Sequence, residues 1–137
     1  MSPAGSEESA PAVLLDTNVV IALFAGDAQV VAALGAVSNV FIPAIVLGEL
    51  LYGAQKSARP GENAEQVRAL AEAVVVLPVD AETAPRYGEI KAVLRNQGTP
   101  IPENDLWIAA LARQHDLALA TRDAHFDVVS GLRIERW

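Results

Sequence analysis

The sequence predicts an α/β protein, a three-layer α/β/α fold built around a five-stranded parallel sheet. Five short apolar runs alternate along the chain with longer segments of helical character. The first run, residues 12–16, is continuously apolar until its closing acid, as expected for a parallel strand that is buried on both faces. Strands that alternate with helices form right-handed crossovers, and these crossovers pack helices against the sheet.

Length and composition predict the domain organisation. With 137 residues, 52% of them hydrophobic, the chain can bury one sizeable core and leaves no room for a second domain. Residues 1–11 are small, polar and acidic, so we predict a disordered tail followed by one domain over residues 12–137. No run approaches the roughly 18 consecutive apolar residues of a membrane span. Cysteine is absent, which excludes disulfides and thiolate metal sites, and we expect a cytoplasmic protein.

The strands are predicted from apolar runs bounded by turn residues. They are expected at residues 12–16, 39–43, 74–79, 117–121 and 132–137. The run at 74–79 is β-branched and contains Pro78, which cannot donate to a strand ladder, so this strand should lie near a sheet edge. The run at 132–137 alternates apolar and charged residues, which predicts a strand at the opposite edge.

The helices are predicted from caps, breakers and apolar faces. They are expected from about residue 19 to 25 and over residues 28–37, 44–57, 62–73, 81–96 and 104–114. Thr17 and Asn18 offer capping side chains for the first helix. The third helix is apolar nearly all round, which predicts burial on more than one side. Residues 57–63 contain Pro60 and Gly61 and are expected to form a loop.

Four acids are predicted to meet at one end of the sheet. Asp16 closes the first strand, and Asp123 follows the fourth strand by two residues. Glu49 lies about a turn and a half into the helix after the second strand, and Asp105 opens the helix before the fourth. Sites in parallel sheets lie beyond the carboxyl ends of the strands, near the change in strand order. All four side chains can therefore point into one crevice.

Each of these acids also has a purely structural interpretation. Asp16 can be a helix cap, Asp105 a first-turn acid that complements a helix dipole, and Asp123 a turn residue. Glu49 can reach solvent at a helix edge, although it stands alone in an apolar helix. Considered together the acids must bind a cation or hold protons, since two unit charges about 5 Å apart repel by roughly 3 kcal/mol at an effective dielectric of about 20. Oxygen-only ligands select hard ions such as Mg²⁺ or Mn²⁺.

An ordered set of motifs then resembles a known family. Residues 13–18 (VLLDTN), Pro43 six residues before Glu49, residues 104–110 (NDLWIAA) and residues 121–126 (TRDAHF) occur in the order and spacing of the PIN-domain ribonucleases. Within that family the chain is similar to the VapC toxins of toxin–antitoxin pairs. The resemblance covers residues 13–137.

The resemblance implies a PIN-like sheet of strand order 3-2-1-4-5 and an endoribonuclease dependent on Mg²⁺ or Mn²⁺. By this resemblance, the family's acidic positions are occupied by Asp16, Glu49, Asp105 and Asp123. The implied reaction is the attack of a metal-activated water on the RNA phosphodiester. The resemblance also implies a homodimer and a cognate antitoxin whose C-terminal segment wraps the toxin and blocks the site. The implied substrates are structured RNAs, often tRNA or rRNA, and DNA is contacted only through the antitoxin.

Residues around the acids are assigned roles by their chemistry. Four polar residues can orient carboxylates or metal-bound waters, with simple capping as the alternative: Thr17, Asn18, Asn104 and Thr121. Three cations can form a phosphate-contacting rim, with solvated surface charge as the alternative: Arg122, Lys56 and Arg59. A local rim matters because a net charge of −7 argues against binding nucleic acid through a broad basic face.

Two aromatic residues and one histidine are interpreted more conservatively. Tyr52 and Trp107 can stack on bases, but their apolar helices favour core or dimer packing. His125 lies two residues from Asp123 and is interpreted as an exposed loop histidine, with an approach to substrate as the alternative.

Two other functional classes compete with RNA hydrolysis. A phosphoacceptor signalling domain also places acids and Mg²⁺ at the carboxyl ends of parallel strands, but it needs a late lysine and none occurs after Lys91. A catalytically inactive PIN-like binding module is the second alternative, and the complete set of acids argues against it. A serine or cysteine triad finds no support, because cysteine is absent and neither histidine has a partner motif.

Overall fold

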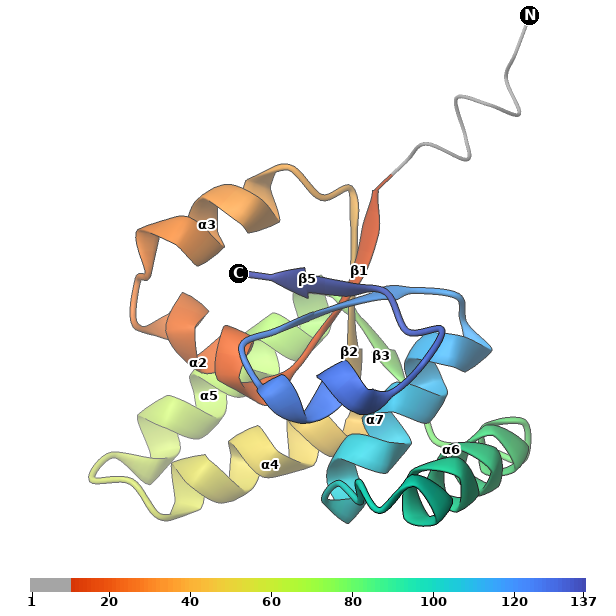
Figure 1. Cartoon of the computed structure of the whole chain (residues 1–137). Helices are drawn as coiled ribbons and strands as arrows, with labels where there is room; N and C mark the ends of the chain where they lie inside the picture. The colour runs from red at the N-terminus through yellow and green to blue at the C-terminus, as the bar shows by residue number, and fades with distance from the viewer. Residues whose placement is uncertain (1–10) are drawn as a thin grey trace, which may run out of the picture.

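The computed structural model of the chain describes residues 11–137, so the predicted tail lies almost entirely outside the described residues. Residues 11–137 form a five-stranded parallel sheet of order β3-β2-β1-β4-β5 with helices on both sides, which confirms the predicted three-layer fold and strand order (Figure 1). The strands are β1 (Ala12–Leu15), β2 (Asn39–Pro43), β3 (Val75–Leu77), β4 (Ala118–Thr121) and β5 (Ile134–Arg136). β3 and β5 are the two edge strands, as predicted.

The helices are arranged as the crossovers require. They are α2 (Thr17–Phe24), α3 (Ala28–Gly35), α4 (Ala44–Gln55), α5 (Pro60–Ala73), α6 (Thr83–Gln97), α7 (Glu103–Gln114) and the short 3₁₀ helix η1 (Ala124–Val128). From β1 to β3 the chain moves in one direction across the sheet, and it then returns past β1 to β4. Because the crossovers are right-handed, the helices before β3 and the helices after β3 lie on opposite faces of the sheet. The α4–α5 pair and the α6–α7 pair accordingly lie on the two sides of the sheet in Figure 1.

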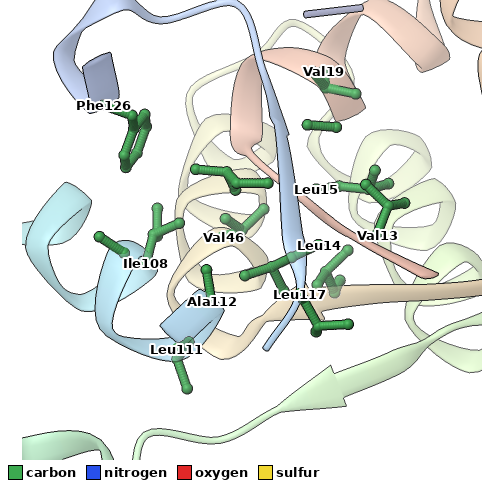
Figure 2. Close-up of a cluster of buried hydrophobic side chains, with 14 of the residues drawn as sticks. Val13, Leu14, Leu15, Val19, Val46, Ile108, Leu111, Ala112, Leu117 and Phe126 are labelled. Atoms are coloured by element: carbon green, nitrogen blue, oxygen red, sulfur yellow. The ribbon is translucent and has the colours of Figure 1, made fainter. Parts of the chain in front are cut away.

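The hydrophobic core surrounds the central strand. Val13, Leu14 and Leu15 of β1 are fully buried between β2 and β4, as the uninterrupted apolar run predicts. Figure 2 shows these side chains among others from α4, α7 and the C-terminal segment, including Ile108 and Phe126. Ile42 of β2 and Leu119 of β4 are also fully buried, so each strand that leads to a predicted acid is anchored in the core.

Three helices begin earlier than predicted, and α7 does so by a single residue, at Glu103 instead of residue 104. The first begins at Thr17 rather than near residue 19, because the Asp16 carboxylate, and not Thr17 or Asn18, caps it by accepting from the Thr17 N–H at 2.8 Å. α5 begins at Pro60, so the predicted loop over residues 57–63 is wrong in its second half. Proline suits the first turn of a helix, where its missing N–H needs no partner.

Several other boundaries also differ. β3 ends before Pro78 and is shorter than the predicted 74–79, and β5 is shorter than the predicted 132–137. α4 buries the stripe Val46, Leu50 and Ala54. On the flanks of this stripe Ile45, Leu47 and Leu51 are partly buried against the core, whereas Tyr52 is 64% exposed. The 3₁₀ helix η1 was not predicted.

Among the helices of residues 11–137, no single one is long and apolar enough to cross a membrane. Only α2 and α3 taken together reach that measure, and the chain bends by 108° between them.

Candidate active site

Asp16 lies at the carboxyl end of the central strand, where β1 passes into α2. Its backbone N–H continues the ladder to β4 by donating to the Ala120 carbonyl at 3.0 Å. The side chain is only 5% exposed, and both carboxylate oxygens accept hydrogen bonds. Oδ1 accepts from the Thr17 N–H at 2.8 Å, and Oδ2 accepts from the Thr121 hydroxyl at 2.7 Å. The carboxylate is therefore fixed by both neighbouring elements.

Thr121 connects Asp16 to Asp123. It is the last residue of β4 and is fully buried. Its hydroxyl donates to Asp16 and accepts the backbone N–H of Asp123 at 2.9 Å. One side chain thus sets the position of one carboxylate and the backbone that carries the second.

Replacement of Thr121 by valine should lower the free energy of unfolding by about 1–3 kcal/mol, because the isosteric side chain leaves a buried carboxylate oxygen and a backbone N–H without their partner. Urea unfolding of both proteins measures this difference. Thr99→Val is the matched control, since among the described residues the buried Thr99 hydroxyl has no hydrogen-bond partner. Equal losses at the two positions would contradict the bridging role of Thr121.

Glu49 is joined to two other elements of the site. From the sixth position of α4, its Oε1 accepts from the Thr17 hydroxyl at 2.6 Å and its Oε2 accepts from the Asn104 side-chain amide at 3.3 Å. Thr17 begins α2 and Asn104 lies in the first turn of α7, so Glu49 ties three helices together beside the carboxyl end of β1. Both of its oxygens already have partners within the protein.

Asp105 and Asp123 converge on His125. The Nδ1 atom of His125 lies 3.0 Å from Oδ2 of Asp105 and 3.1 Å from Oδ2 of Asp123. Asp123 also caps η1, because its Oδ1 accepts from the His125 N–H at 2.9 Å. The structure therefore brings Asp16, Asp105 and Asp123 to one edge of the sheet, with Glu49 joined to them through Thr17 and Asn104.

The electrostatics of the cluster show mutual repulsion. Burial raises the pKa of Asp16, and the charges of Asp123 and Glu49 raise it further, against the hydrogen bonds from Thr121 and Thr17. Burial also raises the pKa of Asp105, and the charges of Asp16 and Asp123 act in the same direction. The pKa of His125 is raised chiefly by its hydrogen bond to Asp105. The site therefore favours the binding of positive charge.

These donors fit a divalent ion. Asp105, Asp123 and His125 each offer one ligand atom, and the three atoms lie within 4.8 Å of one another. Asp16 adds a buried carboxylate whose pKa is raised chiefly by burial and further by the charges of Asp123 and Glu49. Carboxylate oxygens at such spacing are typical ligands of hard cations.

Arg122, one of the three cations predicted for the phosphate-contacting rim, is already engaged within the protein. Arg122 donates from Nη2 to the Asp27 carboxylate and from Nε to the Trp137 carbonyl, both at 2.9 Å. Its backbone N–H donates to the side-chain oxygen of Asn18 at 3.2 Å, which is the role that the structure gives to Asn18. These three contacts tie the loop after β4 to other parts of the fold.

The other two predicted cations lie on the surface beyond Glu49. Lys56 lies over the Tyr52 ring, with Nζ 4.4 Å from the ring centroid, and Arg59 pairs with Glu62 at 3.3 Å in an exposed position. Trp107 stacks on Tyr87 with ring centroids 3.9 Å apart, which joins α7 to α6 and confirms the packing interpretation for Trp107.

A groove of about 320 Å³ lies directly beside Glu49. It runs between α2, α4 and α5, and its mainly apolar lining includes Ile21, Phe24, Leu50 and Val67. Ile21 is more than half exposed although it is a large aliphatic residue. An apolar surface of this kind is typical of a binding face for a partner.

His125 is the residue whose role the sequence interpretation missed. Its side chain is 51% exposed, as a loop histidine would be, yet its ring contacts two of the four acids. The available signal was its position two residues after Asp123, at the start of an unpredicted 3₁₀ turn. Contact with Asp105 depends on the tertiary fold, because 20 residues separate the two.

Comparison with known proteins gives a consistent set of similarities. The model of the PIN domain family matches residues 13–132. The chain is 38% identical over 97 residues to a tRNA(fMet)-specific endonuclease VapC from Shigella flexneri, covering 70% of this chain and 74% of that protein.

Solved structures of VapBC proteins superpose on this chain. A chain of VapBC2 from Rickettsia felis, bound to a promoter DNA fragment, superposes with a TM-score of 0.85 at 28% identity, over 92% of this chain and 98% of that one. A chain of DNA-bound VapBC from Salmonella typhimurium gives a TM-score of 0.84 at 31% identity, over 91% and 97% of the two chains.

Proposed function

The chain belongs to the PIN-domain family, among its VapC ribonucleases, and we propose that it is a divalent-metal-dependent endoribonuclease that acts as the toxin of a toxin–antitoxin pair. The observation that carries this proposal is the convergence of three aspartates from separate elements at the carboxyl edge of β1 and β4. Such a concentration of negative charge is costly unless it binds a cation. The match to a nuclease family does not favour the phosphoacceptor alternative.

The side chains divide into ion-holding and positioning groups. Asp16, Asp105 and Asp123 would hold the ion, which is Mg²⁺ or Mn²⁺ by the chemistry of the carboxylates. When bound, such an ion acidifies a water and neutralises charge on the phosphate and the leaving oxygen. Glu49 holds Thr17 and Asn104 at the rim of the site. The protein's own task would be to orient the phosphodiester and the attacking water.

We propose structured RNA as the substrate class, with tRNA as the first candidate. Support comes from the relative named for tRNA(fMet) cleavage, which is 38% identical to this chain. The net charge of −7 means that the backbone would be held locally, through the bound ion and nearby cations such as Lys56, and not by a broad basic face.

We also propose a cognate antitoxin and a homodimer. Two of the similar structures are VapBC assemblies bound to DNA, and in this chain an apolar groove lies directly beside Glu49. A segment seated in that groove would lie against Thr17 and Glu49, close enough to obstruct the acids. Any contact with DNA would then run through the antitoxin.

The proposal is tested by RNA cleavage with purified protein free of any partner. We expect cleavage of a tRNA pool in Mn²⁺ or Mg²⁺, loss of cleavage in EDTA, and recovery when the ion is restored in excess. Asp105→Asn should cleave far more slowly, because it removes one of the charges that hold the ion. Asp116→Asn is the matched control, since the Asp116 side chain is 93% exposed and pairs with Arg133 beyond the far end of α7 from Asp105.

Two outcomes would overturn the proposal. Cleavage that persists in EDTA would exclude the metal mechanism. No cleavage of any RNA by a folded, metal-loaded protein would favour the inactive binding module instead.

A further inference from the structure

The imidazole of His125 occupies a place in the acidic cluster that a metal ligand would occupy. Its Nδ1 lies 3.0 Å from Asp105 Oδ2 and 3.1 Å from Asp123 Oδ2, and those two carboxylates come from different elements, α7 and the loop after β4. Adjacent ligands of an octahedral ion, each about 2.1 Å from it, lie roughly 3.0 Å apart. The nitrogen thus lies from each of the two oxygens at the spacing of ligands that share one ion, and all three atoms lie within 4.8 Å of one another.

The histidine is held in this place by its own backbone and its neighbours. The His125 N–H donates to Asp123 Oδ1, which leaves Oδ2 of the same carboxylate directed at the ring. Arg136 donates to the Asp123 carbonyl at 2.9 Å, and Phe126, the next residue after His125, is fully buried. These contacts restrain the segment that carries the ring.

We propose that His125 is a ligand of the divalent ion, which makes the site a mixed carboxylate and imidazole centre that prefers Mn²⁺ to Mg²⁺. This inference rests on the proposed metal-dependent function and identifies the ion that the site selects. Mg²⁺ favours oxygen ligands and keeps several waters, whereas imidazole is a ligand typical of transition-metal ions. Replacing one oxygen ligand by the His125 nitrogen shifts the selectivity of the site from Mg²⁺ towards Mn²⁺.

The competing role for His125 predicts the opposite effect on binding. If the ring served only as a counter-ion for Asp105 and Asp123, an incoming metal ion would have to displace it. Removing the histidine would then strengthen metal binding or leave it unchanged. If His125 is a ligand, its removal weakens the binding of Mn²⁺.

Isothermal titration of the whole protein with Mn²⁺ and with Mg²⁺ separates these roles. His125→Gln should weaken Mn²⁺ binding by about tenfold or more, since loss of one group at a metal site costs on the order of 10- to 100-fold in affinity. Mg²⁺ binding should change less. His115→Gln is the matched control, because His115 caps the carboxyl end of α7 away from the cluster, and it should bind both ions as wild type does.

Pulsed electron paramagnetic resonance of the bound Mn²⁺ detects the nitrogen directly. We expect a nitrogen coupling in wild type and in His115→Gln that disappears in His125→Gln. Mn²⁺ bound without a nitrogen coupling, or bound by His125→Gln as tightly as by wild type, would overturn the inference and leave the proposed nuclease intact. Absence of Mn²⁺ and Mg²⁺ binding to wild type would overturn the proposed metal-dependent function itself.

Discussion

Asp16→Asn is expected to lower RNA cleavage roughly 100- to 1000-fold, because the charge that holds an ion is worth several kcal/mol and each 1.36 kcal/mol is about tenfold in rate. Asp16 is the least exposed of the four acids and the one at the centre of the hydrogen-bond network. Asparagine keeps the shape and one acceptor oxygen, so the cap on α2 can persist. The loss should therefore reside in catalysis and not in folding.

The same substitution should raise the stability of the metal-free protein at neutral pH. The pKa of Asp16 is raised in the folded protein, chiefly by burial, so folding disfavours the ionised carboxylate. A raised pKa means that this group's contribution to stability is fully present below its unfolded value near 3.8 and is lost as pH rises through the folded value. Asparagine has no charge and avoids that loss.

Thermal unfolding in EDTA between pH 4 and pH 7.5, beside cleavage assays in Mn²⁺, measures both effects of Asp16→Asn. The difference in melting temperature, variant minus wild type, should grow as pH rises, and added Mn²⁺ should stabilise wild type more than the variant. A variant that melts below wild type in EDTA at pH 7 would show that the carboxylate stabilises the fold. A variant that cleaves normally would remove Asp16 from the catalytic machinery.

The fold was predictable because burial dominates its elements. The apolar runs that form β1 and β2 are short, end in clear turn or acidic residues, and lie in the sheet where the pattern predicts. Strand order came from the family resemblance. The first residues of the helices were harder to predict, because Asp16 and Pro60 each have two local interpretations. Asp16 can be a metal ligand or a helix cap, and Pro60 can be a turn residue or the first residue of a helix.

The predicted acids could be placed because parallel strands all end at one edge of the sheet. What the sequence could not show is how polar side chains connect them. The Thr121 hydroxyl serves two aspartates, and Arg122 contacts Asp27 and Trp137, which are 95 and 15 residues away along the chain. Such contacts depend on tertiary packing and leave no periodic pattern in the sequence. For the same reason His125 was interpreted as an ordinary loop residue.

Phe126→Ala is expected to lower the free energy of unfolding by about 3–5 kcal/mol, a large share of the roughly 5–15 kcal/mol typical of a domain. The Phe126 side chain is fully buried, and it is the single buried side chain among the five residues of η1. Figure 2 shows it within the buried cluster on the side of α7 that carries Ile108. Alanine would leave a cavity that neighbouring side chains fill only in part.

The cost of Phe126→Ala should extend to metal binding, because η1 carries His125 and is capped by Asp123. Urea unfolding gives the stability, and the shift in melting temperature on adding Mn²⁺ gives the relative affinity, which we expect to fall in the variant. Val128→Ala is the control on the same helix: Val128 is 39% exposed, and its loss should cost no more than about 0.5 kcal/mol. If both variants lost the same stability, Phe126 would not anchor η1. If Phe126→Ala were destabilised yet kept its full response to Mn²⁺, the ion would not depend on Asp123 and His125, since their positions rest on that anchor.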